Sequence, residues 1–85
     1  MKEWFVYIVK CSDGSYYTGI AVDINKRIEE HNKGGKIGSK YVRSRRPVKL
    51  VYQEKHATRS SATKREIEIK KMKHGDKKKL FKIKG

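Results

Sequence analysis

Apolar and polar positions follow two periods along this 85-residue chain, and together they predict an α+β fold. The first apolar stretch, residues 4–9 (WFVYIV), is unbroken, which is typical of a strand buried on both faces. Residues 12–14 (Ser-Asp-Gly) supply turn chemistry, and residues 16–18 (Tyr-Tyr-Thr) are β-prone again. The chain therefore predicts a β-hairpin over residues 4–20.

The length of the hairpin loop decides whether two tyrosines share a face of the sheet. A two-residue loop over residues 13–14 places Tyr7 and Tyr17 on opposite faces. A three-residue loop over residues 12–14, ending in a glycine bulge, pairs Tyr7 with Gly19 and brings both tyrosines to one face. Both loops suit the sequence.

A first helix is predicted after the hairpin, with Asp23 as its N-cap and residues 34–35 (Gly-Gly) as its stop. Arg27 and His31 are four residues apart, so both side chains leave the same side of this helix. Taken alone, Arg27 is read as a solvated cation and His31 as a half-buried core histidine. The apolar stripe of the helix consists of Ile24, Ile28 and His31.

Residues 34–39 (GGKIGS) predict a loop, and residues 39–43 a short helical turn before Pro47. Residues 48–54 (VKLVYQE) predict a third strand, which completes a three-stranded antiparallel sheet. His56 is expected in a surface loop after that strand.

A second helix is predicted over residues 58–73, capped by Thr58 or Ser60 and ended by Gly75. Glu66 falls within its buried stripe, where an ionised carboxylate is costly unless it is paired or coordinated. The residues alone leave two explanations open, an ion pair with Arg27 or a ligand for a divalent cation. The stripe itself consists of Ala62, Ile69 and Met72.

A short third helix is expected after Gly75, capped by Asp76 and docked by Leu80 and Phe81. The predicted element order is therefore β-β-α-β-α-α, with helices flanking a small antiparallel sheet, in a single domain over residues 1–85.

Charge narrows the function classes more than any other property of the composition. Twenty-three lysine and arginine residues against nine acidic residues give a net charge of +14. Solubility or a thermophilic source could explain lysine enrichment, but glutamate does not rise with it. The excess favours a polyanionic partner, nucleic acid above all. Seven basic residues and no acid lie between Glu30 and Glu54: Lys33, Lys36, Lys40, Arg43, Arg45, Arg46 and Lys49.

Other classes are disfavoured. No apolar run reaches the length of a membrane-spanning helix, and the chain passes from residues 1–3 directly into a strand without a signal peptide. The single cysteine, Cys11, cannot form an internal disulfide, which predicts a reducing, cytoplasmic compartment.

Two tyrosine triplets, residues 6–8 (Val-Tyr-Ile) and 17–19 (Tyr-Thr-Gly), resemble the motifs of the GIY-YIG nuclease family. The resemblance continues through most of the chain and is strongest to small stand-alone domains related to the excision-repair endonuclease UvrC and the Slx-type structure-specific endonucleases. Its further positions are Arg27, His31, Lys40, Tyr41, Arg46, Pro47, Val48 and Glu66.

The resemblance implies a DNA endonuclease that depends on Mg²⁺ or Mn²⁺, acts on duplex or branched DNA, and serves repair or recombination. Glu66 would be the metal ligand, Arg27 a phosphate clamp, and His31 a proton carrier or positioning group. Tyr17, supported by Tyr7, would orient or deprotonate the attacking water.

DNA contacts are expected from the basic segment before the third strand. The arginines there are suited to backbone phosphates, because nothing in the sequence specifies a groove-reading element. Tyr41 would anchor this segment or support the active site, as the resemblance implies. The predicted DNA-binding residues are Lys40, Tyr41, Arg43, Arg45 and Arg46.

Three departures from the family pattern favour an alternative, a basic nucleic-acid-binding module with weak or no catalysis. The first triplet lacks its glycine, and residues 20–21 (Ile-Ala) stand where many relatives carry a lysine. The asparagine that many relatives place after the glutamate helix has no match in residues 75–85. The separate DNA-recognition domain of larger relatives is also missing, so specificity is low or comes from a partner protein.

Overall fold

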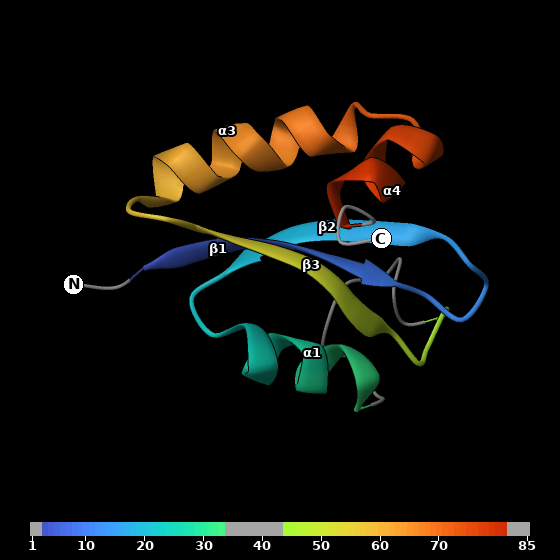
Figure 1. The fold of residues 1–85 in the computed structure, drawn as a ribbon. Coiled ribbons are helices and arrows are strands. Elements are labelled where there is room, and N and C mark those ends of the chain that lie inside the picture. The colour runs from blue at the N-terminus through green and yellow to red at the C-terminus, as the bar shows by residue number, and fades with distance from the viewer. Residues whose placement is uncertain (1–2, 34–43, 82–85) are drawn as a thin grey trace.

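The structure is a computed structural model that describes residues 3–33 and 44–81. The strands β1 (Trp4–Lys10), β2 (Tyr16–Ala21) and β3 (Lys49–His56) form one antiparallel sheet in the order β2-β1-β3. The helices are α1 (Ile24–Asn32), α3 (Arg59–Lys70) and α4 (His74–Phe81). Helix α1 covers one face of the sheet, and α3 and α4 cover the other (Figure 1). The predicted α+β fold and its element order are confirmed.

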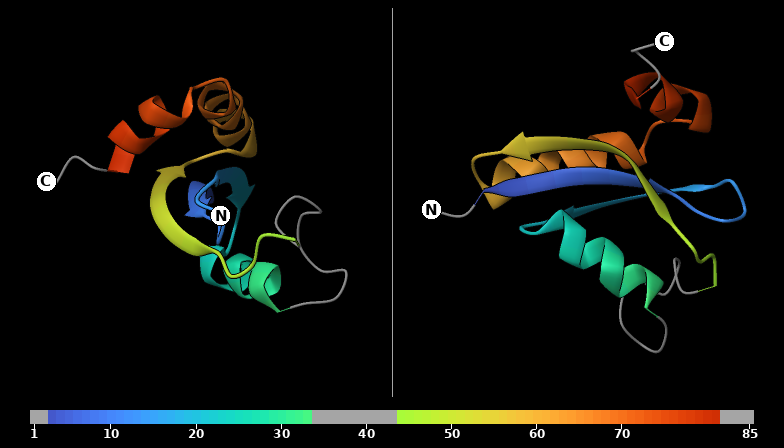
Figure 2. Two further views of the ribbon diagram at one scale, coloured as in Figure 1. Left: turned by 90° about the vertical axis from the view of Figure 1, so that its right-hand side faces the viewer. Right: turned by 60° about the horizontal axis from the view of Figure 1, so that its bottom comes forward.

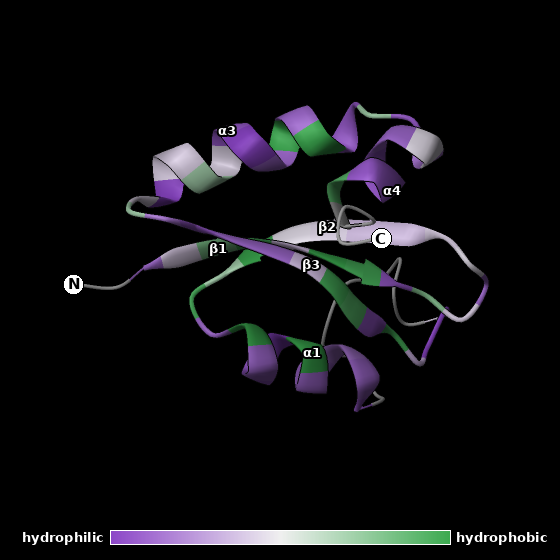
Figure 3. Ribbon diagram, in the orientation of Figure 1, coloured by the Kyte–Doolittle hydropathy of each residue, from purple (hydrophilic) through white to green (hydrophobic). Residues whose placement is uncertain are grey.

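Strand β1 lies at the centre of the sheet, and its apolar run is buried on both faces as predicted. Tyr7 and Val9 pack with Ile24 of α1, whereas Val6 and Ile8 pack with Ile69 of α3 and its neighbours. All four of these β1 side chains are at most 1% exposed. Hydrophilic residues occur along both α3 and α4, with only a few strongly apolar positions among them (Figure 3). The few apolar residues of the chain thus form a thin core on each side of the sheet.

The hairpin has the three-residue loop. Tyr7 pairs with Gly19 and Val9 pairs with Tyr17, so the two tyrosines share the α1 face of the sheet. The backbone N–H of Cys11 donates to the carbonyl of Ser15 at 2.8 Å, which closes the loop. Gly14 takes φ +86°, the left-handed conformation that this bulge requires.

Helix α1 begins where the sequence predicts, because the Asp23 side chain accepts from the backbone N–H of Lys26. Its stripe is also as predicted, with Ile24 and His31 buried and Ile28 packed against the same cluster. The predicted stop at residues 34–35 and the helical turn at residues 39–43 lie outside the described residues.

Three predicted boundaries are wrong. Helix α3, capped by Thr58, ends at Lys70, and α4 begins at His74, so Gly75 lies inside α4 and Asp76 in its first turn rather than at its cap. The backbone N–H of Asp76 donates to the carbonyl of Lys73, which starts the new helix. Strand β3 continues to His56 because it pairs there with Trp4 of β1, so His56 is not a loop residue.

Figure 2 shows the helices from two further directions. Helix α3 lies along the sheet, and α4 follows the end of α3 in a different direction. None of the helices within the described residues has the length and apolar character needed to cross a membrane.

Candidate active site

The two tyrosines of the triplets meet at the outer strand of the sheet, β2. The rings of Tyr7 and Tyr17 are tilted against each other with centroids 6.5 Å apart. Tyr7 lies directly over Gly19, because a Cβ atom at that position would come within 2.6 Å of the Tyr7 hydroxyl oxygen. The glycine of the second triplet is therefore needed for close approach, not for an unusual backbone conformation.

His31 of α1 joins the tyrosine pair from above the same face. Its Nε2 lies 3.0 Å from the Tyr7 hydroxyl oxygen, in a buried hydrogen bond. Its ring meets the edge of the Tyr17 ring with centroids 5.6 Å apart. His31 is 0% exposed, so it is fully buried and not half-buried as the alternative of a core histidine assumed.

Burial fixes the protonation of this pair. Burial, together with the weaker effects of Tyr17 and Glu66, raises the pKa of Tyr7 to about 12, although nearby Arg27 opposes the rise. Burial also lowers the pKa of His31, with Arg27 acting in the same direction. At neutral pH the pair is therefore a protonated phenol beside a neutral imidazole. Such a phenol is poorly suited to deprotonate water, which agrees with a supporting position for Tyr7 beside Tyr17.

Arg27 stands at the solvent side of this buried pair. Its Nη1 atom forms an ion pair with Glu30 at 3.1 Å, and its side chain is 36% exposed. It is also close enough to the Tyr7 hydroxyl to lower the pKa of that group. The guanidinium is therefore accessible to an anion from solvent while its ion pair with Glu30 holds it beside Tyr7.

Glu66 reaches the same place from the opposite face of the sheet. Its side chain is 19% exposed, and its carboxylate pairs with Lys70, whose Nζ lies 3.4 Å from Oε2. The Lys70 Nζ also lies 5.9 Å from the centre of the Tyr17 ring. Because Arg27 pairs with Glu30 and Glu66 with Lys70, the alternative ion pair between Arg27 and Glu66 is not formed.

The five predicted catalytic residues thus gather around the β2 edge. Helix α1 contributes Arg27 and His31, and helix α3 contributes Glu66, while Tyr7 and Tyr17 come from the hairpin. Family models were compared with the chain, and the GIY-YIG catalytic domain matches residues 3–79. The chain belongs to the GIY-YIG family.

Relatives of this GIY-YIG chain support the same grouping. A UPF0213 protein of Staphylococcus aureus (strain Mu3 / ATCC 700698) is 63% identical over 70 residues, which cover 82% of this chain and 83% of the relative. The solution NMR structure of the UPF0213 protein BH0048 from Bacillus halodurans matches with a TM-score of 0.60 and 38% identity, over 98% of this chain and 86% of that one. Protein EF2693 from E. faecalis gives a TM-score of 0.66 at 36% identity, with the same coverage.

The predicted DNA-binding residues of this GIY-YIG domain divide into two groups. Lys40, Tyr41 and Arg43 lie outside the described residues. Arg45 and Arg46 are described, and both have structural partners.

Arg45 connects its segment to the hairpin loop. Its Nε donates to the Asp13 carboxylate at 3.0 Å, and its carbonyl accepts from the backbone N–H of Ser12 at 2.9 Å. The Nε of Arg46 donates to the carbonyl of His31 at the end of α1. Both residues therefore help to close the fold around the site.

Two residues of this GIY-YIG site were missed by sequence reasoning. Asn32 exchanges two hydrogen bonds with the backbone of Val48, at 3.1 and 2.7 Å, and so fixes the start of β3 against α1. Lys70 was given no role, although its spacing of four residues from Glu66 is the signal for a helical ion pair. No periodicity argument could have placed it over Tyr17.

Proposed function

We propose that this protein is a divalent-metal-dependent endonuclease that hydrolyses phosphodiester bonds in DNA, with duplex or branched DNA as its substrate. The observation that carries the proposal is that one side chain, Lys70, pairs with Glu66 and also lies over the ring of Tyr17 at the β2 edge. Tyr17 and Glu66 come from opposite faces of the sheet, and both remain partly accessible there. Membership of the GIY-YIG family adds to this support.

The donor set suits Mg²⁺ or Mn²⁺ held by Glu66. No group of three or more His, Cys, Asp or Glu side chains suited to a metal occurs within residues 3–33 and 44–81. Mg²⁺ does not need such a group, since it keeps several waters and binds through one or two carboxylates together with substrate phosphates. When bound, the cation would polarise the phosphate and stabilise the leaving oxygen.

A second feature fits an additional ligand near Glu66. Thr18, the middle residue of the second triplet, is 2% exposed, and its hydroxyl oxygen has no hydrogen-bond partner among the described residues. It pairs with Ile8, whose side chain packs on the α3 face, so Thr18 belongs to the face that Glu66 approaches. A buried hydroxyl without a partner costs free energy, which a bound water would recover.

The side chains divide the remaining tasks. Tyr17 orients the attacking water or takes its proton, a role that Tyr7 with its pKa of about 12 cannot fill. Arg27 holds the non-bridging phosphate oxygens with its guanidinium. The neutral His31 positions Tyr7, and Tyr7 in turn supports the ring of Tyr17.

Cleavage of a DNA panel tests the proposal. Single-stranded, duplex, flap and junction DNA would be incubated with Mg²⁺, with Mn²⁺ or with EDTA, using the wild-type chain and Tyr17→Phe. Cutting that requires both the metal and the Tyr17 hydroxyl is the expected result. Cutting that persists in EDTA or in Tyr17→Phe would overturn the assignment of the site.

The second candidate function is a basic nucleic-acid-binding module without efficient catalysis. The ion pair between Lys70 and Glu66 favours this candidate, because the Lys70 ammonium binds the Glu66 carboxylate that a metal would need. Tight, salt-sensitive binding to DNA without cutting under any of these conditions would establish this candidate in place of the enzyme.

A further inference from the structure

The last turn of α3 and helix α4 carry a dense positive charge. Residues 70–79 contain six lysines and a single acid, Asp76. All of these lysines except the half-buried Lys77 are exposed. Lysines at this density repel one another unless a counter-charge is bound, so the segment is suited to a polyanionic ligand.

This basic segment adjoins the candidate active site. Lys70 is paired with Glu66 and lies over the Tyr17 ring. Lys77 lies half-buried in the first turn of α4, where its backbone N–H donates to the carbonyl of Lys73 at 3.0 Å. Burial lowers the pKa of Lys77, and the charge of Lys70 lowers it further. The positive charge of Lys70 at the β2 edge is therefore continued by Lys77 on α4.

An aromatic contact holds α4 at this end of the sheet. The His74 ring packs against Tyr16 with centroids 4.4 Å apart, and Tyr16 directly precedes Tyr17 in the chain. Leu80 packs with the core cluster on the same face. The basic helix is thus fixed relative to the active site rather than attached by a free linker.

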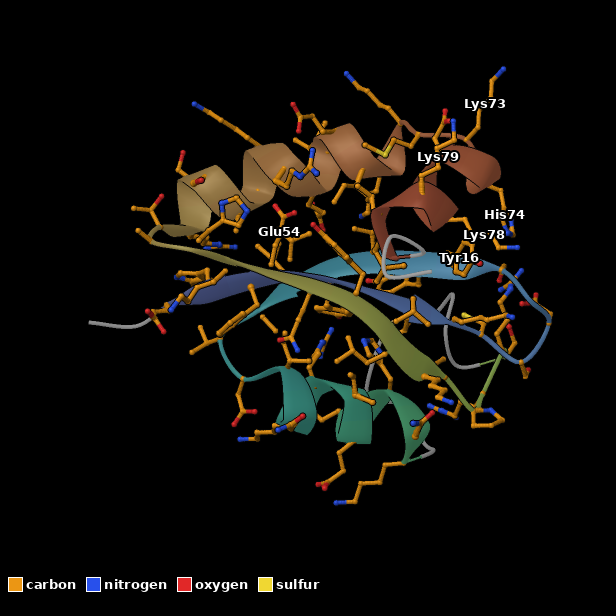
Figure 4. The ribbon with its side chains drawn as sticks, viewed as in Figure 1. Tyr16, Glu54, Lys73, His74, Lys78 and Lys79 are labelled. Carbon is orange, nitrogen blue, oxygen red and sulfur yellow. The ribbon has the colours of Figure 1, made fainter. Side chains whose placement is uncertain are left out.

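Helix α4 presents its lysines on two different sides. Lys78 follows His74 by four residues, so it lies on the side of α4 on which His74 packs against Tyr16 (Figure 4). Lys73 and Lys79 point away from the sheet (Figure 4). Lys79 is 82% exposed at its side chain and lies 3.7 Å from Asp76, its ion-pair partner. The side that adjoins the active site is therefore distinct from the outer side.

We propose that Lys70, Lys77 and Lys78 bind the phosphate backbone of a DNA strand on one side of the scissile bond, and we name this surface the α4 track. The inference rests on the proposed function, because it takes the DNA at the β2 edge as its starting point. Phosphates suit the track because ammonium groups on flexible stems bind them as point charges, and each such contact releases condensed counterions. The track supplies affinity without sequence readout.

The test compares two double variants with the same loss of charge. Lys77→Gln/Lys78→Gln removes two cations from the α4 track, and Lys73→Gln/Lys79→Gln removes two from the outer side. Binding of a fluorescent DNA duplex and of a flap would be measured by anisotropy between about 50 and about 200 mM salt. All proteins would carry Glu66→Gln, so that binding is recorded without cutting, and circular dichroism would verify their folding.

The track variant should bind at least about tenfold more weakly, with the salt slope reduced by about 0.9 for each lost phosphate contact. The outer variant should keep nearly the slope of its parent. Equal losses in the two variants would reduce the effect to net charge and overturn the proposal, as would unchanged binding in both. The proposal would also be overturned if binding to anionic lipid vesicles, and not to DNA, depended on Lys77 and Lys78.

Failure of the track and failure of the nuclease can be separated. The binding assay does not require catalysis, so a selective loss in the track variant stands even if the wild-type chain cuts no DNA. Conversely, cutting by the wild-type chain with equal binding in both double variants would retain the nuclease and discard the track.

Discussion

On the α1 side of the β2 edge, Tyr7 and His31 are almost fully buried and hydrogen-bonded to each other, whereas on the α3 side Glu66 and Lys70 are partly exposed and joined by an ion pair. The first pair has its protonation fixed by burial. The second can exchange its partner for a ligand, because a pair near solvent contributes little to stability.

This difference assigns different tasks to the two sides. The buried side is a rigid support whose loss would lower the stability of the fold, and the accessible side is where we propose that a cation and a phosphate bind. Tyr17 lies between them, in contact with His31 on one side and Lys70 on the other. Substitutions on each side should therefore separate stability from activity.

The largest expected contrast is between the two tyrosines. Tyr17→Phe should lower the cleavage rate by at least about 100-fold, the usual contribution of a proton-transfer group, and change the free energy of unfolding by less than about 1 kcal/mol. Tyr7→Phe should destabilise the fold by about 1–3 kcal/mol, because His31 Nε2 loses its buried partner. Single-turnover cleavage and urea unfolding measure the two effects. A reversed pattern would exchange the roles assigned to the tyrosines.

Gly19→Ala tests the close packing on the buried side. The new methyl group would lie 2.6 Å from the Tyr7 hydroxyl oxygen and 2.8 Å from Cζ, so Tyr7 must move. The expected cost is about 1–3 kcal/mol in the free energy of unfolding. Gly75→Ala is the matched control, since a Cβ there meets nothing within 4 Å and alanine favours α4 by up to about 1 kcal/mol. Equal effects at both glycines would show that Tyr7 is not held tightly.

The lowered pKa of His31 predicts a pH dependence of stability. The unfolded chain takes up a proton near pH about 6.5, and the folded chain resists it because of burial and Arg27. Stability is therefore full above about pH 6.5 and is lost as the pH falls toward the lowered pKa of the folded state, with a slope of at most about 1.4 kcal/mol per pH unit.

Urea unfolding at about pH 7.5 and at about pH 5.5 measures this dependence, in a range above the usual pKa values of carboxylates. His31→Gln is the control, and its stability should vary less between the two pH values than that of the wild-type chain. An equal dependence in both proteins would mean that another group is responsible.

The smallest effect is expected from the exposed pair. Lys70→Met should change the free energy of unfolding by less than about 0.5 kcal/mol, because Lys70 is 50% exposed and its attraction to Glu66 is screened by solvent. Thermal unfolding in low and high salt would measure it. A loss of several kcal/mol would show that the pair is structural and not available to a ligand.

The sequence predicted the arrangement of the elements well because that arrangement depends on local patterns. The buried run of β1, the Asp23 cap and the α1 stripe each follow from residues close in the chain. The hairpin loop was left open because Gly14 suits both lengths. Arg45 helps to hold the observed loop through Asp13, and no local pattern reveals a contact across 32 residues.

The site was predicted less fully from the residues themselves. The helical stripe indicated the side on which Glu66 lies, but it could not decide between Arg27 and a metal, because that choice depends on how α3 crosses the β2 edge. The roles predicted for Tyr17 and Glu66 came from the family resemblance. Lys70 was missed for the same reason, since its contact with Tyr17 exists only once two elements on opposite faces are packed together.

The most direct test of the account is single-turnover cleavage of branched DNA in Mn²⁺ by the wild-type chain and by Glu66→Gln, with DNA binding measured in the same samples. Glutamine keeps the shape of the side chain and removes the charge that a cation requires. The account predicts that Glu66→Gln binds DNA as tightly as the wild-type chain and cuts at least about 100-fold more slowly. Equal cutting by both proteins would contradict the assignment of Glu66 and, with it, the metal-dependent site at the β2 edge.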